Sequence, residues 1–140
     1  MLNLKRIKEL DSELYQKITK LWQETGISKP ERKDSLESIK NNLHYTGTII
    51  IAEENEDLAG AVWVCHDYRR LYIHHMAVSP SRQNQGIGSK LLYECIAIAK
   101  ELGLQAKLEV NIDNPAAFHL YQKSGFTELT GYRVLIKRDV

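Results

Sequence analysis

Residues 76–89 read MAVSPSRQNQGIGS, and this stretch is the most informative for the fold. It predicts the end of a strand, a loop over 79–85, and an amphipathic helix that begins at Gly86-Ile87-Gly88. Glycines before a helix leave backbone N–H groups unshielded by side chains, and the helix dipole adds partial positive charge there. The stretch therefore predicts a seat for a phosphate or pyrophosphate group.

This glycine loop differs from two widespread phosphate-binding patterns. It lacks the third glycine of the dinucleotide-binding fingerprint. Lys90 follows Ser89, whereas a Walker loop needs the order Gly-Lys-Ser/Thr. Taken alone, the loop is equally well explained as a tight turn without a ligand.

The composition predicts one soluble globular domain over residues 1–140. Hydrophobic residues make up 43% of the chain and charged residues 26%, and the net charge is +1. This balance favours neither a nucleic-acid partner nor an anionic membrane. The first residues lack the apolar core of a signal peptide, so we expect a cytoplasmic protein. Cys65 and Cys95 lie on apolar stretches and are predicted to be buried free thiols.

Hydrophobic periodicity predicts the element order β-α-α-β-β-β-α-β-α-β-β. The predicted strands span 2–7, 48–52, 58–66, 71–78, 106–111, 126–129 and 132–137. The predicted helices span about 12–23, 30–43, 87–102 and 115–124, the second with Pro30 in its first turn. The strand-helix-strand unit over 71–111 implies a parallel pair with a right-handed crossover, and the hairpins imply antiparallel pairs. The predicted fold is α/β (mixed α+β), with a twisted mixed sheet of about six to seven strands and four flanking helices.

The helix over 87–102 is expected to bury one side. Its apolar residues recur at helical spacing, and they are Leu91, Leu92, Cys95, Ile98, Ala99 and Leu102. Gly103 is expected to end this helix in a left-handed conformation.

A second informative segment, residues 111–126, reads NIDNPAAFHLYQKSGF. On a helix, Ala117, Tyr121 and Ser124 share one face. A small residue one turn before a tyrosine leaves room for a ligand beside the phenol. The alternative is a core tyrosine with its hydroxyl at the rim.

Together, the two segments resemble the GCN5-related N-acetyltransferase (GNAT) family. The family's pattern Gln/Arg-x-x-Gly-x-Gly/Ala is matched by Gln83, Asn84, Gln85, Gly86, Ile87 and Gly88. Its pattern Asn-x-x-Ala-x-x-x-Tyr-x-x-x-Gly-Phe is matched by Asn114, Ala117, Tyr121, Gly125 and Phe126. The strong match covers residues 71–126, and the order of elements fits a GNAT-like fold along the whole chain.

The resemblance implies an N-acetyltransferase that uses acetyl-CoA as co-substrate. The backbone of Met76, Ala77 and Val78 would pair with the pantetheine arm, and the amides from Gln85 to Ser89 would hold the pyrophosphate. Asn111 and Asn114 would lie near the pantetheine. Tyr121 matches the tyrosine that protonates the leaving thiolate. An amine would attack the thioester directly in a ternary complex, without a covalent enzyme intermediate.

Such an attack needs a base, and the strand over 71–78 offers two histidines. Strict alternation places Tyr72, His74, Met76 and Val78 on one side and Ile73, His75 and Ala77 on the other. Some relatives carry a glutamate at the position of Tyr72, which this chain lacks. We expect His74 to be the base and keep His75 in reserve, because a strand bulge would exchange their faces.

The acceptor side is less well defined by the sequence. The resemblance implies that residues 22–34 wall the acceptor pocket, with these candidates: Trp22, Glu24, Glu31, Asp34 and, from a later turn, Tyr68. Core packing and solvated charge are the alternatives for these residues. The expected acceptor is a small-molecule amine, with a protein amine as the alternative, and homodimers occur in proteins of this kind.

No metal is expected, because adjacent histidines on a strand cannot share one ion. Two other functions remain open from the sequence. One is a non-catalytic acyl-CoA-binding sensor, and the other is a nucleotide-binding domain that uses the same glycine loop.

Overall fold

The computed structural model describes the backbone of residues 1–140 and every side chain except that of Glu31. The chain forms two compact units, Met1–Leu108 and Glu109–Val140. The elements of the first unit are β1 (Asn3–Ile7), α1 (Ser12–Glu24), η1 (Pro30–Arg32), α2 (Leu36–His44), β2 (Thr48–Glu54), β3 (Asp57–His66), β4 (Arg70–Val78), η2 (Pro80–Arg82), α3 (Ile87–Leu102) and β5 (Gln105–Leu108). The second unit contains α4 (Pro115–Lys123).

The first unit is built on one mixed sheet with the strand order β1-β2-β3-β4-β5. Strands β1 to β4 are antiparallel neighbours, and β5 runs parallel to β4 after the crossover through α3. This arrangement confirms the predicted mixed sheet, and the chain has the four predicted helices, of which α1, α2 and α3 belong to the unit that holds the sheet. The sheet has five strands among the described residues, and the predicted number of six to seven is wrong.

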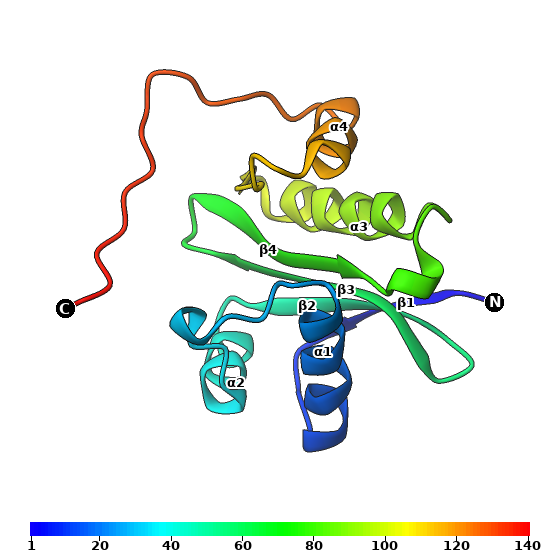
Figure 1. The fold of residues 1–140 in the computed structure, drawn as a ribbon. Helices are drawn as coiled ribbons and strands as arrows, with labels where there is room; N and C mark the ends of the chain where they lie inside the picture. Colours follow the sequence, from blue (N-terminus) through cyan, green and yellow to red (C-terminus); the bar gives the residue numbers. More distant parts are fainter. The chain divides into compact units, whose positions relative to one another are not determined.

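Helices cover both faces of this sheet. Figure 1 shows α1 and α2 on one face and α3 on the other. Because side chains alternate along a strand, Ile49 and Ile51 pack under α1 and α2, whereas Ile50 faces α3. We call these the α1/α2 face and the α3 face.

Helix α3 has the bounds that its periodicity predicts. Gly103 adopts a left-handed φ of 70° at its C-terminal end, as expected. The predicted burial of Leu102 is wrong, because this side chain is 47% exposed at the last turn. Gly60 of β3 lies so close to α3 that an added Cβ would meet the Ile87 and Leu91 side chains at 3.1 Å. At 16 residues α3 is the longest helix described, and none of the described helices has the length and apolar character of a membrane span.

The predicted second helix is divided in the structure. Pro30 starts the short 3₁₀ turn η1, and Lys33 follows with a left-handed φ of 54°. Helix α2 begins separately, because the Ser35 hydroxyl accepts a hydrogen bond from the Ser38 N–H as an N-cap. The segment between η1 and α2 therefore leaves helical geometry, and Asp34 lies in it.

The second unit contains α4 and an irregular segment. The Asn114 side chain caps α4 by accepting from the Ala117 N–H, and Gly125 after the helix has a left-handed φ of 97°. The predicted strands over 126–129 and 132–137 are wrong, since no ladder forms there among the described residues. A strand needs a partner for its backbone groups, and β-propensity alone does not supply one.

Candidate active site

The N-terminus of α3 presents backbone amides without a side-chain cap. Gly86 is the N-cap residue and has a left-handed φ of 78°, and no side chain caps the first turn. An added Cβ at Gly86 would meet no atom within 4 Å, so the left-handed conformation rather than crowding selects glycine. The first N–H groups of a helix have no acceptor inside it. This end of α3 can therefore bind an anion, as the sequence predicts.

The loop before α3 is tied to the sheet by side chains. Gln83 donates from Nε2 to the Val78 carbonyl oxygen at 3.3 Å. Arg82 donates to the Glu54 carboxylate at 2.8 Å and to Gln85 Oε1 at 3.3 Å. These bonds tie the side chains of Arg82, Gln83 and Gln85 to the sheet and to one another, and they fix the loop before the backbone amides of α3.

Strand β4 has an open edge next to this loop. The parallel pairing with β5 ends at Ile73 and Leu108, but β4 continues to Val78. The Ser79 N–H donates to Ala59 on the β3 side at 2.8 Å. Since successive N–H groups point to opposite edges, the Val78 N–H points to the open edge. An amide-bearing ligand can pair with such an edge as an added strand would.

A β-bulge interrupts β4 at His75. Ala61 pairs with Ala77 and Trp63 with His74, so Val62 alone opposes the two residues 75–76. His75 has a left-handed φ of 50°, which is uncommon for a residue with a side chain. The predicted alternation is therefore wrong beyond His74.

The bulge brings both histidines of β4 to the α1/α2 face. His74 lies beside Trp63 with ring centroids 6.1 Å apart, and the His75 ring is 5.6 Å from the same tryptophan. Ala77 also belongs to the core under α1 and α2. Strict alternation predicted that His74 and His75 lie on opposite faces of the sheet. In the structure the centroids of their rings are 6.5 Å apart on one face.

His75 is paired with a carboxylate from the segment before α2. Its Nε2 lies 2.7 Å from Asp34 Oδ2, and the two side chains are only 14% and 15% exposed. Trp22 packs edge-on against the imidazole at 4.9 Å between ring centroids. The Tyr15 hydroxyl donates to the Asp34 backbone carbonyl and so connects this segment to α1.

His74 has a different partner. Its Nε2 lies 3.5 Å from the Cys65 sulfur, and its side chain is exposed. Burial raises the pKa of the Cys65 thiol, and the nearby Asp67 carboxylate raises it further. The thiol therefore stays protonated at neutral pH, which argues against Cys65 as a nucleophile. The thiol of Cys95, buried under α3, has its pKa raised by burial to about 12.

In the second unit, two asparagines shape the start of α4. Asn111 accepts the Asp113 N–H on its side-chain oxygen at 2.8 Å, and Asn114 accepts the Ala117 N–H at 3.1 Å. Tyr121 is buried on α4 and contacts the Phe126 ring. The predicted roles of these residues toward a ligand stay predictions.

The other residues predicted to line the acceptor pocket lie in different environments. Trp22 is 1% exposed and belongs to the core, and Glu24 forms an ion pair with Lys20 at 3.9 Å. Tyr68 is 79% exposed in the turn before β4. The side chain of Glu31 lies outside the described residues.

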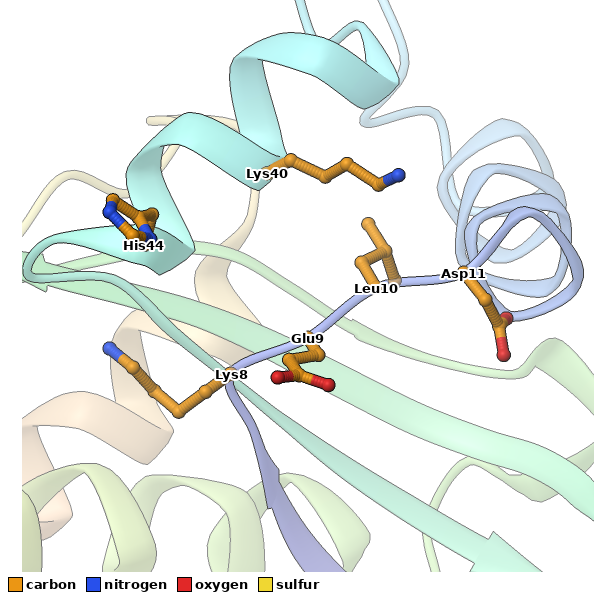
Figure 2. Close-up of a pocket in the computed structure, with 6 residues that line it drawn as sticks. All are labelled: Lys8, Glu9, Leu10, Asp11, Lys40 and His44. Carbon is orange, nitrogen blue, oxygen red and sulfur yellow. The ribbon is translucent and has the colours of Figure 1, made fainter.

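Two hollows of the first unit hold charges of both signs. One, of about 570 Å³, lies where the link from β1 to α1 faces α2 (Figure 2), and Lys8, Glu9, Leu10, Asp11, Lys40 and His44 line it. The other, of about 500 Å³, borders η2 and α1. Three of its cations already have carboxylate partners, namely Lys17, Lys20 and Arg82. Within the described part of the chain, no group of three or more His, Cys, Asp or Glu residues is placed to hold a metal ion.

The pairing of Asp34 with His75 was missed by the sequence analysis. Asp34 is named there only as a candidate wall of the acceptor pocket, and no local pattern connects residues 41 positions apart. A left-handed histidine in a strand also has no reliable sequence signal.

Solved structures of other proteins share this fold. The fold matches the ribosomal-protein-S18-alanine N-acetyltransferase of Escherichia coli with a TM-score of 0.77 and 23% identity, covering 93% of this chain and 80% of that one. An aminoglycoside acetyltransferase from an uncultured soil metagenomic sample matches with a TM-score of 0.76 and 18% identity, covering 97% of each chain.

Curated relatives match over shorter stretches. N-alpha-acetyltransferase RimI of Mycobacterium tuberculosis is 43% identical over 54 residues, which are 39% of this chain and 33% of the relative. L-amino acid N-acyltransferase MnaT of Escherichia coli is 31% identical over 84 residues, 56% of this chain and 49% of the relative. The chain thus spans less than half the length of these relatives. Residues 7–126 match the family described as Acetyltransferase (GNAT) family, and the chain therefore belongs to the GNAT family of acetyltransferases.

Proposed function

We propose that this chain transfers an acetyl group from acetyl-CoA to a primary amine by direct attack in a ternary complex. The observation that carries the proposal is the open edge of β4 beyond Ile73, next to the uncapped N-terminus of α3 at Gly86. The edge suits the amides of pantetheine, and the helix terminus suits the pyrophosphate.

In this proposal the main chain binds the donor. The backbone of Met76, Ala77 and Val78 lies along pantetheine and pairs with it through the groups at its open edge, and the amides from Gln85 to Ser89 hold the pyrophosphate. The Val78 N–H, which points to the open edge, polarises the thioester carbonyl. Such fixed donors stabilise the charge that develops on a carbonyl oxygen in the transition state.

Two side chains move protons in the proposed reaction. Tyr121 donates a proton to the leaving CoA thiolate, since a phenol is protonated at neutral pH. A histidine of β4, His74 or His75, takes a proton from the attacking amine. Asn111 and Asn114 lie near the pantetheine in this proposal, and the small side chain of Ala117 leaves room for the ligand beside the Tyr121 phenol.

The acceptor is proposed to be a small-molecule amine, with a protein amine as the alternative. The names of the relatives point to different acceptors, among them an amino acid, an aminoglycoside and a ribosomal protein. The amine nucleophile is what these acceptors share.

Donor binding is tested by calorimetry with acetyl-CoA. Gly86→Ala should weaken binding about tenfold or more, because a Cβ disfavours the left-handed conformation that aims the amides at the ligand. Gly103→Ala is the matched control. It changes a glycine of equal conformation and equally open surroundings at the other end of α3, and it should leave the affinity unchanged.

Catalysis is tested by following free thiol with acetyl-CoA and a panel of amines. Tyr121→Phe should lower turnover by about an order of magnitude or more and preserve CoA affinity. Tight CoA binding without thiol release for any amine would instead support a non-catalytic acyl-CoA sensor.

A further inference from the structure

We propose that His75 is the catalytic base and that Asp34 is the residue that positions it. This inference rests on the proposed acetyl transfer and names the base for that reaction. The evidence is the buried pair that these two side chains form across 41 residues of sequence, on the face of β4 where its backbone bulges.

The pair with Asp34 sets the tautomer of the imidazole. A carboxylate can only accept a hydrogen bond, so the Nε2–H of His75 donates to Oδ2 at 2.7 Å. In the neutral ring the other nitrogen, Nδ1, then carries the lone pair. Among the described residues Nδ1 has no hydrogen-bond partner, so it is available to take a proton from a substrate.

Packing holds the ring in one orientation. The Trp22 ring lies edge-on at 4.9 Å with an interplanar angle of 88°, and Trp63 lies at 5.6 Å with an angle of 79°. The Trp63 indole is itself fixed, since its Nε1–H donates to Asn42 Oδ1 at 2.7 Å. A base that is already oriented loses little entropy on reaching the transition state.

The backbone places this ring beside the proposed thioester site. His75 directly precedes Met76 on the segment of β4 that continues beyond the end of β5. The left-handed φ of 50° turns the imidazole to the α1/α2 face while the following residues keep their open edge. Strained backbone at such a position is typical of functional sites.

His74 contacts a thiol. Its ring contacts the Cys65 sulfur at 3.5 Å, and a thiol whose pKa is raised by burial carries no charge at neutral pH. That thiol therefore cannot orient the His74 ring through a charge-assisted hydrogen bond, whereas the Asp34 carboxylate does so for His75.

The proposed step balances as follows for a primary ammonium. The substrate nitrogen loses one proton to Nδ1 of His75, which passes the proton to solvent. The lone pair of the substrate nitrogen then attacks the thioester carbon. The C–N bond forms, the C–S bond breaks, and the electron pair of that bond leaves with sulfur. The nitrogen loses its second proton to solvent, and the sulfur gains one from Tyr121, which takes a proton back from solvent. The products are an amide, free CoA and one proton released to solvent.

The experiment compares three histidine variants with the wild type. His75→Asn keeps a residue that tolerates the left-handed backbone but removes the basic nitrogen. It should lower kcat by about a hundredfold or more and leave the dissociation constant of acetyl-CoA unchanged. His74→Asn should cost less than about tenfold, and His44→Asn, at an exposed position on α2, should have no effect.

The role of Asp34 is read from kcat and from its rescue by a conservative variant. Asp34→Asn should reduce kcat and leave the dissociation constant of acetyl-CoA unchanged, because an amide can also donate to Nε2 and then no longer fixes the proton there. Asp34→Glu should restore part of the rate, because it keeps the carboxylate.

The outcomes separate this inference from the proposed function. If His75→Asn is as active as the wild type, or if His74→Asn loses more activity than His75→Asn, the assignment of His75 and Asp34 is wrong. The proposed acetyl transfer is unaffected by that outcome. A wild type that binds acetyl-CoA but acetylates no amine overturns the proposed function as well. If His75→Asn does not fold, nitrogen NMR of the wild-type imidazoles decides, since a proton on Nδ1 of His75 in place of Nε2 overturns the assignment.

Discussion

The two faces of the central sheet are closed in different ways. Under α3 the strands contribute aliphatic side chains, among them Ile50, Val62, Val64, Leu71 and Ile73, all nearly inaccessible. Under α1 and α2 the strands also contribute polar groups that are bonded in pairs, namely Trp63 with Asn42, His75 with Asp34 and Cys65 with His74.

This difference shows which face of the sheet can hold reactive side chains in a defined geometry. Aliphatic packing is nondirectional and tolerates any arrangement that fills space, so it supports the sheet without defining a reactive geometry. A half-buried polar group needs a partner at a specific distance and angle. The α1/α2 face therefore carries the candidate base, and the α3 face supplies the stability that this arrangement requires.

The largest expected effects come from truncating a leucine under each face. Leu91→Ala on α3 and Leu43→Ala on α2 should each lower the free energy of unfolding by about 2–5 kcal/mol, because both side chains are almost completely buried. Urea denaturation of the two variants measures this. A much smaller loss for Leu43→Ala would mean that the α1/α2 face is loosely packed and that the two faces differ in more than polarity.

A smaller effect is expected from removing one polar pair. Asn42→Ala leaves the indole N–H of Trp63 without its acceptor and should lower the free energy of unfolding by about 1–3 kcal/mol. Asn41→Ala is the matched control, since it makes the same change at the neighbouring, exposed position of α2. Equal urea midpoints for the two variants would show that the pair contributes nothing to stability.

The same contrast separates what the sequence predicts from what it misses. The apolar spacing in residues 87–102 predicts α3, and its burial pattern is confirmed except at Leu102. Local repetition of this kind needs no knowledge of the partner surface. The paired groups of the α1/α2 face depend on contacts between distant segments and on one bulge, which alternation cannot reveal.

The C-terminal residues show the limit of strand patterns. Tyr132, Val134 and Ile136 alternate as in a strand, yet they are 73–78% exposed and have no ladder. Strand pairing is a property of two segments, so one segment with high propensity is insufficient. The candidate site divides in the same way. The glycine loop before α3 could be predicted from its residues, whereas the partner of His75 could not.

The last expected effect concerns the two cysteines, Cys95 on α3 and Cys65 on the α1/α2 face. Burial raises the pKa of Cys95 to about 12, above that of an unfolded cysteine. A raised pKa in the folded state gives stability that is complete below the unfolded value and is lost as pH rises toward the folded one. Between about pH 9 and 11, the titration of this thiol in the unfolded chain should therefore lower the free energy of unfolding by at most about 1.4 kcal/mol for each pH unit.

Cys95→Ala should flatten this alkaline decline, measured by urea denaturation across that pH range. Cys65→Ala is the comparison from the α1/α2 face. Its pKa is also raised, but the thiol is half-buried and contacts Asn42 and His74, so its removal should flatten the decline less. In the native wild type, a thiol reagent should label Cys65 before Cys95. The reverse order would contradict the assignment of the α3 face as the more completely closed of the two.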